Sequence, residues 1–349
     1  MSQCVIAEAA NLDYNRGMGG RSLFRGAMVA AAALALLTAT GCSKLKEAAG
    51  LQGGQAFLDS QIPPGLSPQY FPPEGFVWGA YRAGSLPEAR YGVASPPVNP
   101  RAQVLILADA DYPAETYFEL SRQLLSAGYG VWLLDVPGQG GAGHYLLQGD
   151  AVFTRSYHDS QTTAADFIRD IIHPTADKPL FVLGTGYSAI NALSLSTMLK
   201  SDAMAGFIAF DPYTGGDIDK GKVWHSEDVP AGYWGGIAQT WQMSNPDLRL
   251  RVKSEQWRGQ VKKAYAELNG LHLPVISLKG RTASVLVVEP KAETTATANA
   301  ASALCAHLPH CRLEANDGPQ ALGASVGDFI KTELPEAHEP QAGVALNAS

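Results

Sequence analysis

The sequence predicts an α/β fold: a mostly parallel β-sheet with helices on both faces and a cap inserted after the sixth strand. From residue 104 onwards, short apolar runs alternate with amphipathic helical segments, and such alternation is typical of parallel sheets. The alternation stops between residues 212 and 273 and then resumes, so these residues are predicted to form the cap. The composition, 46% hydrophobic and 17% charged residues, is that of a packed globular domain and excludes a disordered or fibrous chain.

The individual elements follow from the length and period of each apolar run. Two short strands precede the alternation and six more belong to it: 76–82, 89–94, 104–108, 131–135, 180–184, 206–211, 284–289 and 312–315. Apolar residues that recur every three or four positions predict the helices: 117–125, 164–172, 189–199, 296–307 and 325–334. Because strands that are apolar throughout must be covered on both sides, the helices are expected on both faces of the sheet.

The N-terminal 41 residues have the pattern of an export signal. Arg21 and Arg25 precede an apolar run at residues 27–39, and small residues follow it. A basic flank, an apolar core and small residues before a cleavage site define a secretory signal peptide, and the run is too short to span a bilayer. Residues 1–41 are therefore predicted to be removed, with Met18 as an alternative start because acidic residues precede it.

The segment Ala39-Thr40-Gly41-Cys42 resembles the lipobox of bacterial lipoproteins. The resemblance implies that Cys42 carries a diacylglyceryl group and becomes the mature N-terminus; a plain signal peptide or an uncleaved anchor is the alternative. Ser43 follows the cysteine, at the position where an aspartate would imply retention in the inner membrane. The expected location is the bacterial cell envelope, lipid-anchored at the outer membrane and facing the periplasm, with the bilayer as a partner.

The rest of the chain divides into a tether, one domain and a tail. The Gly-rich and then Pro-rich composition of residues 42–75 predicts a tether between membrane and domain. Residues 76–334 are predicted to form the domain with its cap, and the polar residues 335–349 a flexible tail. The net charge of −7 makes a nucleic-acid partner unexpected.

Two cysteines remain for the mature domain, Cys305 and Cys311, because Cys4 is removed with the signal and Cys42 is lipidated. In an oxidising compartment such a pair is most simply a disulfide. The run 305–311 also contains two histidines, which leaves a metal cluster as the alternative. No second group of ligands accompanies it, so no metal and no cofactor are expected.

The most specific motif follows the strand at residues 131–135. Asp135, Gly138 and Gly140 match the aspartate-x-x-glycine-x-glycine turn of the lysophospholipase and monoacylglycerol-lipase branch of the α/β-hydrolase superfamily. The late cap and the segments 117–120 and 128–129 also resemble that branch, and the resemblance covers residues 101–334. It implies the α/β-hydrolase fold and a serine, histidine and acid triad with an oxyanion hole.

The residues at the triad positions depart from this pattern. After the strand at 180–184, the place of the nucleophile falls on Gly186, which has no side chain to attack a carbonyl. Ala108-Asp109 replaces the family's His-Gly in the oxyanion loop, and a carboxylate there would repel a developing oxyanion. The acid position falls near Glu293, and the position of the base falls at Pro319.

Two serines are alternatives for the nucleophile. Ser188 lies two residues beyond Gly186 and could act in a shifted turn with Asp211 or Glu293 as the acid; its other interpretation is a serine that satisfies backbone donors at a helix N-terminus. Ser325 lies in a literal Gly-x-Ser-x-Gly, but no strand precedes it. It is predicted to be an N-cap of the last helix.

The cap is rich in aromatic and basic residues. It contains Trp224, Tyr233, Trp234, Trp241 and Trp257. One predicted helix has an apolar face, formed by Trp257, Val261, Ala264, Tyr265 and Leu268. The stretch 249–263, which overlaps this helix, is rich in basic residues. This pattern predicts either a helix packed on the core with a solvated basic face or a lid over an acyl pocket near anionic lipid.

These observations predict a membrane-tethered pseudo-hydrolase that binds a lipid-like or acyl ligand under the cap, or a protein partner. The alternative is an active carboxylic ester hydrolase, a divergent esterase or lysophospholipase that uses Ser188. A third hypothesis is an envelope lipoprotein that has kept the fold for a structural role.

Overall fold

A computed structural model describes residues 54–145, 151–199, 203–230, 232–270, 277–278, 281–282, 284–291, 295–308 and 310–334. Four predictions lie outside the described residues: the signal peptide with its alternative start, the lipidated Cys42, the acid Glu293 and the tail 335–349. These four stay predictions. Within the described residues, every helix is too short or too polar to cross a membrane.

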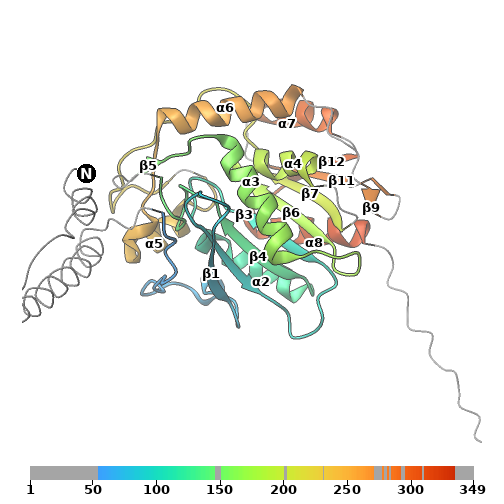
Figure 1. The fold of residues 1–349 in the computed structure, drawn as a ribbon, viewed down its shortest axis with the longest axis horizontal. Coiled ribbons are helices and arrows are strands. Elements are labelled where there is room, and N and C mark those ends of the chain that lie inside the picture. Colours follow the sequence, from blue (N-terminus) through green and yellow to red (C-terminus); the bar gives the residue numbers. More distant parts are fainter. Residues whose placement is uncertain are drawn as a thin grey trace, which may run out of the picture. The chain divides into compact units, whose positions relative to one another are not determined.

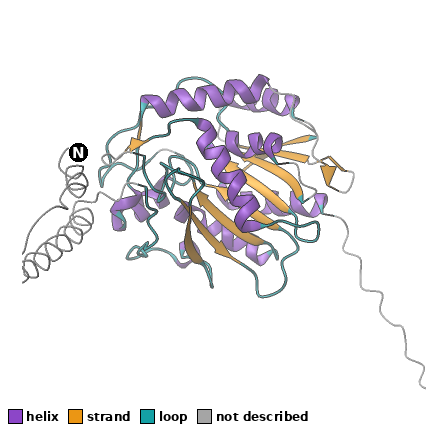
Figure 2. Ribbon diagram, viewed as in Figure 1, coloured by secondary structure: helices purple, strands orange, loops and turns teal. Residues whose placement is uncertain are grey.

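An eight-stranded sheet forms the centre of the domain (Figures 1 and 2). Its strands are β1 (Val77–Tyr81), β2 (Ala89–Ala94), β3 (Gln103–Leu107), β4 (Gly130–Asp135), β6 (Leu180–Thr185), β7 (Met204–Phe210), β11 (Ser284–Pro290) and β12 (Cys311–Asn316). They follow the order β1-β2-β4-β3-β6-β7-β11-β12; β2 pairs antiparallel with β1 and β4, and the other pairs are parallel. The predicted fold class is confirmed, and each predicted strand lies within two residues of an observed one.

Helices cover both faces of the sheet. They are α2 (Phe118–Ser126), α3 (Tyr157–Phe167) with its π-helical continuation η3 (Ile168–Ile172), α4 (Ser188–Met198), α7 (Thr295–His307) and α8 (Pro319–Glu333). Alternate residues of β3 point to opposite faces: Leu105 packs in a core with α3, α4 and α7, whereas Ile106 packs in a core with α2 and α8. The sheet is therefore buried on both sides, as its continuous apolar strands require.

The last helix begins at Pro319, earlier than predicted, and this corrects the interpretation of Ser325. Proline fits the first turn of a helix, where its missing N–H has no partner to lose. Gly318 precedes it with φ +109°. Ser325 lies inside the helix and is not its N-cap.

The cap packs on both sides of the sheet. It comprises α5 (Gly235–Ser244), η4 (Pro246–Leu248), β8 (Val252–Lys253) and α6 (Glu255–Gly270), followed by the short strands β9 (Ser277–Leu278) and β10 (Arg281–Thr282). Trp257 on α6 is buried in the core that contains α4, whereas Trp241 on α5 packs edge-on against Phe118 of α2. Four of the five residues of the predicted apolar face of α6 are buried and the fifth, Tyr265, is half-buried, so this helix is part of the core.

The predicted tether reaches Gly75, but residues from 54 onwards belong to the domain, and this corrects the predicted boundary. The N–H of Phe57 donates to the carbonyl of Gly141, and Asn245 exchanges two hydrogen bonds with the backbone of Gln61. Leu66 is buried in the core beside α2. A Pro-rich segment packs in this way when the domain supplies partners for its free backbone groups.

The aspartate-x-x-glycine-x-glycine turn after β4 encloses a buried ion cluster. Arg90 donates to both Asp135 and Glu115, at 2.5 to 2.9 Å, and all three side chains are fully buried. A Cβ at Gly140, where φ is +50°, would overlap the Asp135 carboxylate, which explains the glycine. The motif that carries the family resemblance is therefore a structural device.

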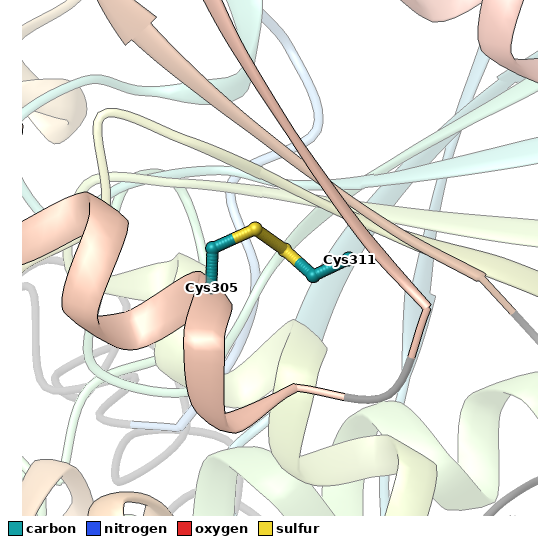
Figure 3. Close-up of a disulfide and its surroundings, with 2 residues drawn as sticks. All are labelled: Cys305 and Cys311. Carbon is teal, nitrogen blue, oxygen red and sulfur yellow. A yellow bond between two sulfur atoms is a disulfide. The ribbon is translucent and has the colours of Figure 1, made fainter.

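Cys305 and Cys311 form the predicted disulfide. Figure 3 shows it joining the end of α7 to the start of β12. The described residues contain no cluster of ligands suited to a metal ion.

Candidate functional site

A pocket of about 280 Å³ opens at the carboxyl ends of β3, β6 and β7. The turns after these strands contribute Asp109, Gly186 and Asp211, and the cap contributes Tyr233 and Trp234. In open α/β sheets, ligands bind at this end of the strands, where the loops converge. The pocket is therefore the candidate site of the domain.

Gly186 lies at a sharp turn between β6 and α4. Its φ of +54° is left-handed, a conformation that favours glycine. A Cβ at Gly184 would lie 2.6 Å from the Cα of Ala189, so the strand and the helix also approach too closely for a side chain there. This strand–turn–helix has the form of a nucleophile elbow without a nucleophile.

The carboxylate of Asp109 fills the space in front of this turn. Its Oδ1 accepts the N–H of Ala110 at 2.7 Å and the N–H of Tyr187 at 3.1 Å. Its Oδ2 lies where a side chain on residue 186 would begin, because a Cβ added to Gly186 would overlap it.

The two amides that hold Asp109 have a defined role in α/β-hydrolases. There, the oxyanion hole combines the N–H of the residue after the nucleophile with an N–H from the loop after the third strand. In this chain, those positions are Tyr187 and Ala110, and both donate to one oxygen of Asp109. Asp109 therefore takes the place of both the serine side chain and the oxyanion.

Burial, and then the negative charge of Asp111, raise the pKa of the Asp109 carboxyl well above its usual range. The N–H donors and the charge of Lys253 oppose this shift without cancelling it. Lys253 comes from β8 of the cap and forms an ion pair with Asp111. The cap thus closes a charged cluster of Asp109, Asp111 and Lys253 at the edge of the pocket.

Ser188 does not line the pocket. It is the first residue of α4, only 1% exposed, and its hydroxyl donates to the carbonyl of Ala108 at 2.7 Å. This geometry matches the interpretation of a serine that satisfies backbone at a helix N-terminus. It gives no support to Ser188 as a nucleophile, because the hydroxyl is hydrogen-bonded to a carbonyl oxygen and does not line the pocket.

The base position differs from that of a working triad, whereas one of the two acid candidates lies at the pocket. No histidine lines the pocket within the described part of the chain. Pro319 begins α8, and the ring of Tyr233 lies 3.2 Å from the point where a Cβ on the preceding Gly318 would be. An aromatic side chain therefore lies beside the residue that precedes the expected base position. Asp211, the alternative acid, does line the pocket.

Sequence comparison identifies the class of protein that this fold and site define. Residues 98–294 match the model of the family described as serine aminopeptidase, S33, so the chain belongs to this family of α/β-hydrolases. The match confirms the resemblance to the lysophospholipase and monoacylglycerol-lipase-like branch. No curated protein matches the chain in sequence.

Several solved structures are similar to the domain. A soluble variant of monoglyceride lipase from Saccharomyces cerevisiae, in complex with a substrate analogue, has a TM-score of 0.56 at 14% identity, over 78% of this chain and 98% of that one. A carboxyl esterase from Bacillus coagulans has a TM-score of 0.51 at 10% identity, over 74% and 99%. The monoacylglycerol lipase of Paleococcus ferrophilus has a TM-score of 0.50 at 13% identity, over 69% and 98%. At these identities the similarity shows the fold alone.

Two features of the site were not predicted from the sequence. The sequence shows that Ala108-Asp109 replaces the family's His-Gly, and this predicted that Asp109 would repel an oxyanion. It did not predict that the Asp109 carboxylate accepts hydrogen bonds from the two backbone amides of the oxyanion hole. Lys253 was counted as one of several basic residues of the cap and not as the partner of Asp111. The contacts of Asp109 with Tyr187 and of Lys253 with Asp111 join residues far apart in sequence, so no local pattern signals them.

Proposed function

We propose that the protein is a non-hydrolytic member of its family that binds a small ligand in the pocket at the elbow. The catalytic position has no nucleophile, and the pocket keeps the location and size of a small-molecule site. Its volume of about 280 Å³ is close to the lower end of the range typical of such sites, roughly 300–1,000 Å³.

The position of Asp109 carries this proposal. Acyl transfer needs a nucleophile at the elbow and free N–H donors for the oxyanion. The Asp109 carboxylate fills the first place and accepts both donors of the second. For an ester carbonyl to reach these amides, the carboxylate would have to leave them, and its negative charge would still oppose a developing oxyanion.

The competing hypothesis is a divergent esterase or lysophospholipase. Family membership and the fold shared with lipases and an esterase favour it. Its nucleophile would be Ser188, which would have to turn away from the carbonyl of Ala108 and enter the pocket. The buried position of Ser188 is the reason to prefer the binding function.

We further propose that the domain acts in the bacterial cell envelope, lipid-anchored through Cys42 at the outer membrane and facing the periplasm. The disulfide supports an oxidising compartment. Intact mass of membrane-extracted protein should show a diacylglyceryl group on Cys42, and Cys42→Ala should be lost from the membrane fraction. An unmodified, soluble mature form would contradict the anchor.

Hydrolysis assays test the binding function. Short-chain p-nitrophenyl esters, a lysophospholipid and a monoacylglycerol should show no turnover above the uncatalysed rate with the wild type, Ser188→Ala or Asp109→Asn. Turnover by the wild type that Ser188→Ala abolishes would establish the esterase hypothesis instead. Turnover that Asp109→Asn abolishes would assign the chemistry to the carboxylate, and it would equally overturn the proposal.

A further inference from the structure

The pocket has an unusual charge. Its described lining contains four aspartates and no lysine, arginine or histidine; the aspartates are Asp109, Asp111, Asp211 and Asp217. Lys253 and Lys262 pair with Asp111 and Asp217. Asp109 has no cation within ion-pairing distance in the described part of the chain.

Asp109 is the group that points to a ligand. Its residue is only 5% exposed, and its Oδ1 is fully used by two N–H donors. Its Oδ2 accepts no hydrogen bond from the described residues and faces the turn at Gly186, which lines the pocket. The carboxylate is therefore nearly buried while one of its oxygens accepts no hydrogen bond within the described part of the chain, and a cation bound in the pocket would supply the missing partner.

Aromatic rings form the other walls. The pocket is lined by Tyr112, Tyr187, Phe210, Tyr213, Tyr233 and Trp234. These rings support one another: Tyr187 and Tyr213 have centroids 5.4 Å apart, and Trp234 lies 5.2 Å from Phe210 and 5.8 Å from Tyr112. Aromatic faces attract cations through the ring quadrupole, and cages of such rings are known to recognise quaternary ammonium groups.

We propose that this pocket binds an organic cation whose ammonium group lies against Oδ2 of Asp109 and among the aromatic rings. The proposal rests on the proposed function and names its ligand class. An acyl chain or a fatty-acid anion would leave Oδ2 without a partner and, in the second case, would add a like charge. The described residues offer no cluster for a metal ion, and the aromatic walls favour a large, weakly hydrated cation.

Calorimetric titration with a matched pair of probes tests the ligand class. Choline is the cation, 3,3-dimethylbutan-1-ol is its neutral isostere, and octanoate represents an acyl ligand. We expect choline to bind at least tenfold more tightly than the isostere. Asp109→Asn should weaken choline binding at least tenfold and leave binding of the isostere unchanged. Asp177→Asn, which removes an exposed charge from a turn outside the pocket, is the control and should bind choline like the wild type.

Each outcome separates the two proposals. Equal affinity for choline and its isostere, unchanged choline binding by Asp109→Asn, or no choline binding by the folded wild type would overturn the cation proposal. Binding of octanoate or the isostere alone, without ester turnover, would overturn the cation proposal but leave the binding function intact. Ester turnover by the wild type would overturn the binding function itself, whatever choline does.

Discussion

Two charged clusters lie at neighbouring strand ends, and each combines two carboxylates with one cation. In the first, Arg90 donates to both Glu115 and Asp135, and the three side chains are sealed from solvent. In the second, Lys253 pairs with Asp111, but Asp109 lines a pocket and keeps one oxygen without a partner. The same kinds of residue thus build two different clusters. In the first, both carboxylates are paired with the cation, whereas in the second the Asp109 carboxylate has no ion-pair partner among the described residues.

The difference also appears in the electrostatics of the two clusters. Burial lowers the pKa of Arg90, but the charges of Glu115 and Asp135 raise it more, so the guanidinium stays charged. At Asp109 the balance is reversed, because burial and Asp111 raise its pKa and only a more distant lysine and two amides oppose them. We infer that the first cluster stabilises the fold, whereas the second reduces stability in exchange for a binding site.

Breaking the first cluster should have the largest effect. Arg90→Met leaves two buried carboxylates without a cation, so the free energy of unfolding should fall by about 3–5 kcal/mol. Urea denaturation followed by circular dichroism measures it. The control is Arg169→Met, which removes an exposed ion pair and should change the free energy by less than about 1 kcal/mol. Similar losses in both variants would show that the buried cluster has no special role.

Adding a side chain at the elbow tests how completely Asp109 fills it. Gly186→Ser should lower the free energy of unfolding by about 1–3 kcal/mol, because the serine must adopt a positive φ and displace the carboxylate. It should hydrolyse no esters, since a serine without a base is a weak nucleophile. Thermal unfolding measures the change in stability, and an ester assay measures the hydrolytic activity. In a protein that also carries Asp109→Gly, Gly186→Ser should be less destabilising. An equal loss of unfolding free energy there would mean that the Asp109 carboxylate does not occupy the space of a side chain at residue 186.

Removal of the disulfide should destabilise the protein at a place outside both charged clusters. Replacing Cys305 and Cys311 together by serine should lower the free energy of unfolding by about 2 kcal/mol, as expected for a short closed loop. Neither cysteine lines the pocket, so ligand affinity should not change. Denaturation and titration of the same sample separate the two effects. A change in affinity would show that general stability, and not Asp109, controls binding.

Asp109→Asn should have the smallest effect, and of opposite sign. The amide oxygen can still accept both N–H donors, and no buried charge remains, so the free energy of unfolding at pH 7 should rise by about 1 kcal/mol. Because the folded-state pKa of Asp109 is raised, the wild type loses stability as pH increases above the ordinary carboxyl pKa. The gain should therefore shrink as pH falls to about 4. A gain independent of pH would show that Asp109 is not titrating.

The sequence predicted the sheet well because continuous apolar strands and periodic helices are local signals. The strand predicted at 180–184 also placed the elbow at Gly186, and the φ of +54° fits that position. The packing of residues 54–75 was missed, because Pro- and Gly-rich composition does not reveal partners such as Asn245. The clusters were missed for the same reason: Arg90 meets Asp135, and Asp109 meets Tyr187, across long sequence separations.

Reaction with a fluorophosphonate tests the central claim, that the elbow holds no activated serine, most directly. Such reagents modify a serine that a neighbouring base has activated. Intact mass spectrometry of the folded wild type should show no adduct under conditions that fully label an active serine hydrolase, and Ser188→Ala should behave identically. A stoichiometric adduct on the wild type that maps to Ser188 and disappears in Ser188→Ala would contradict the account.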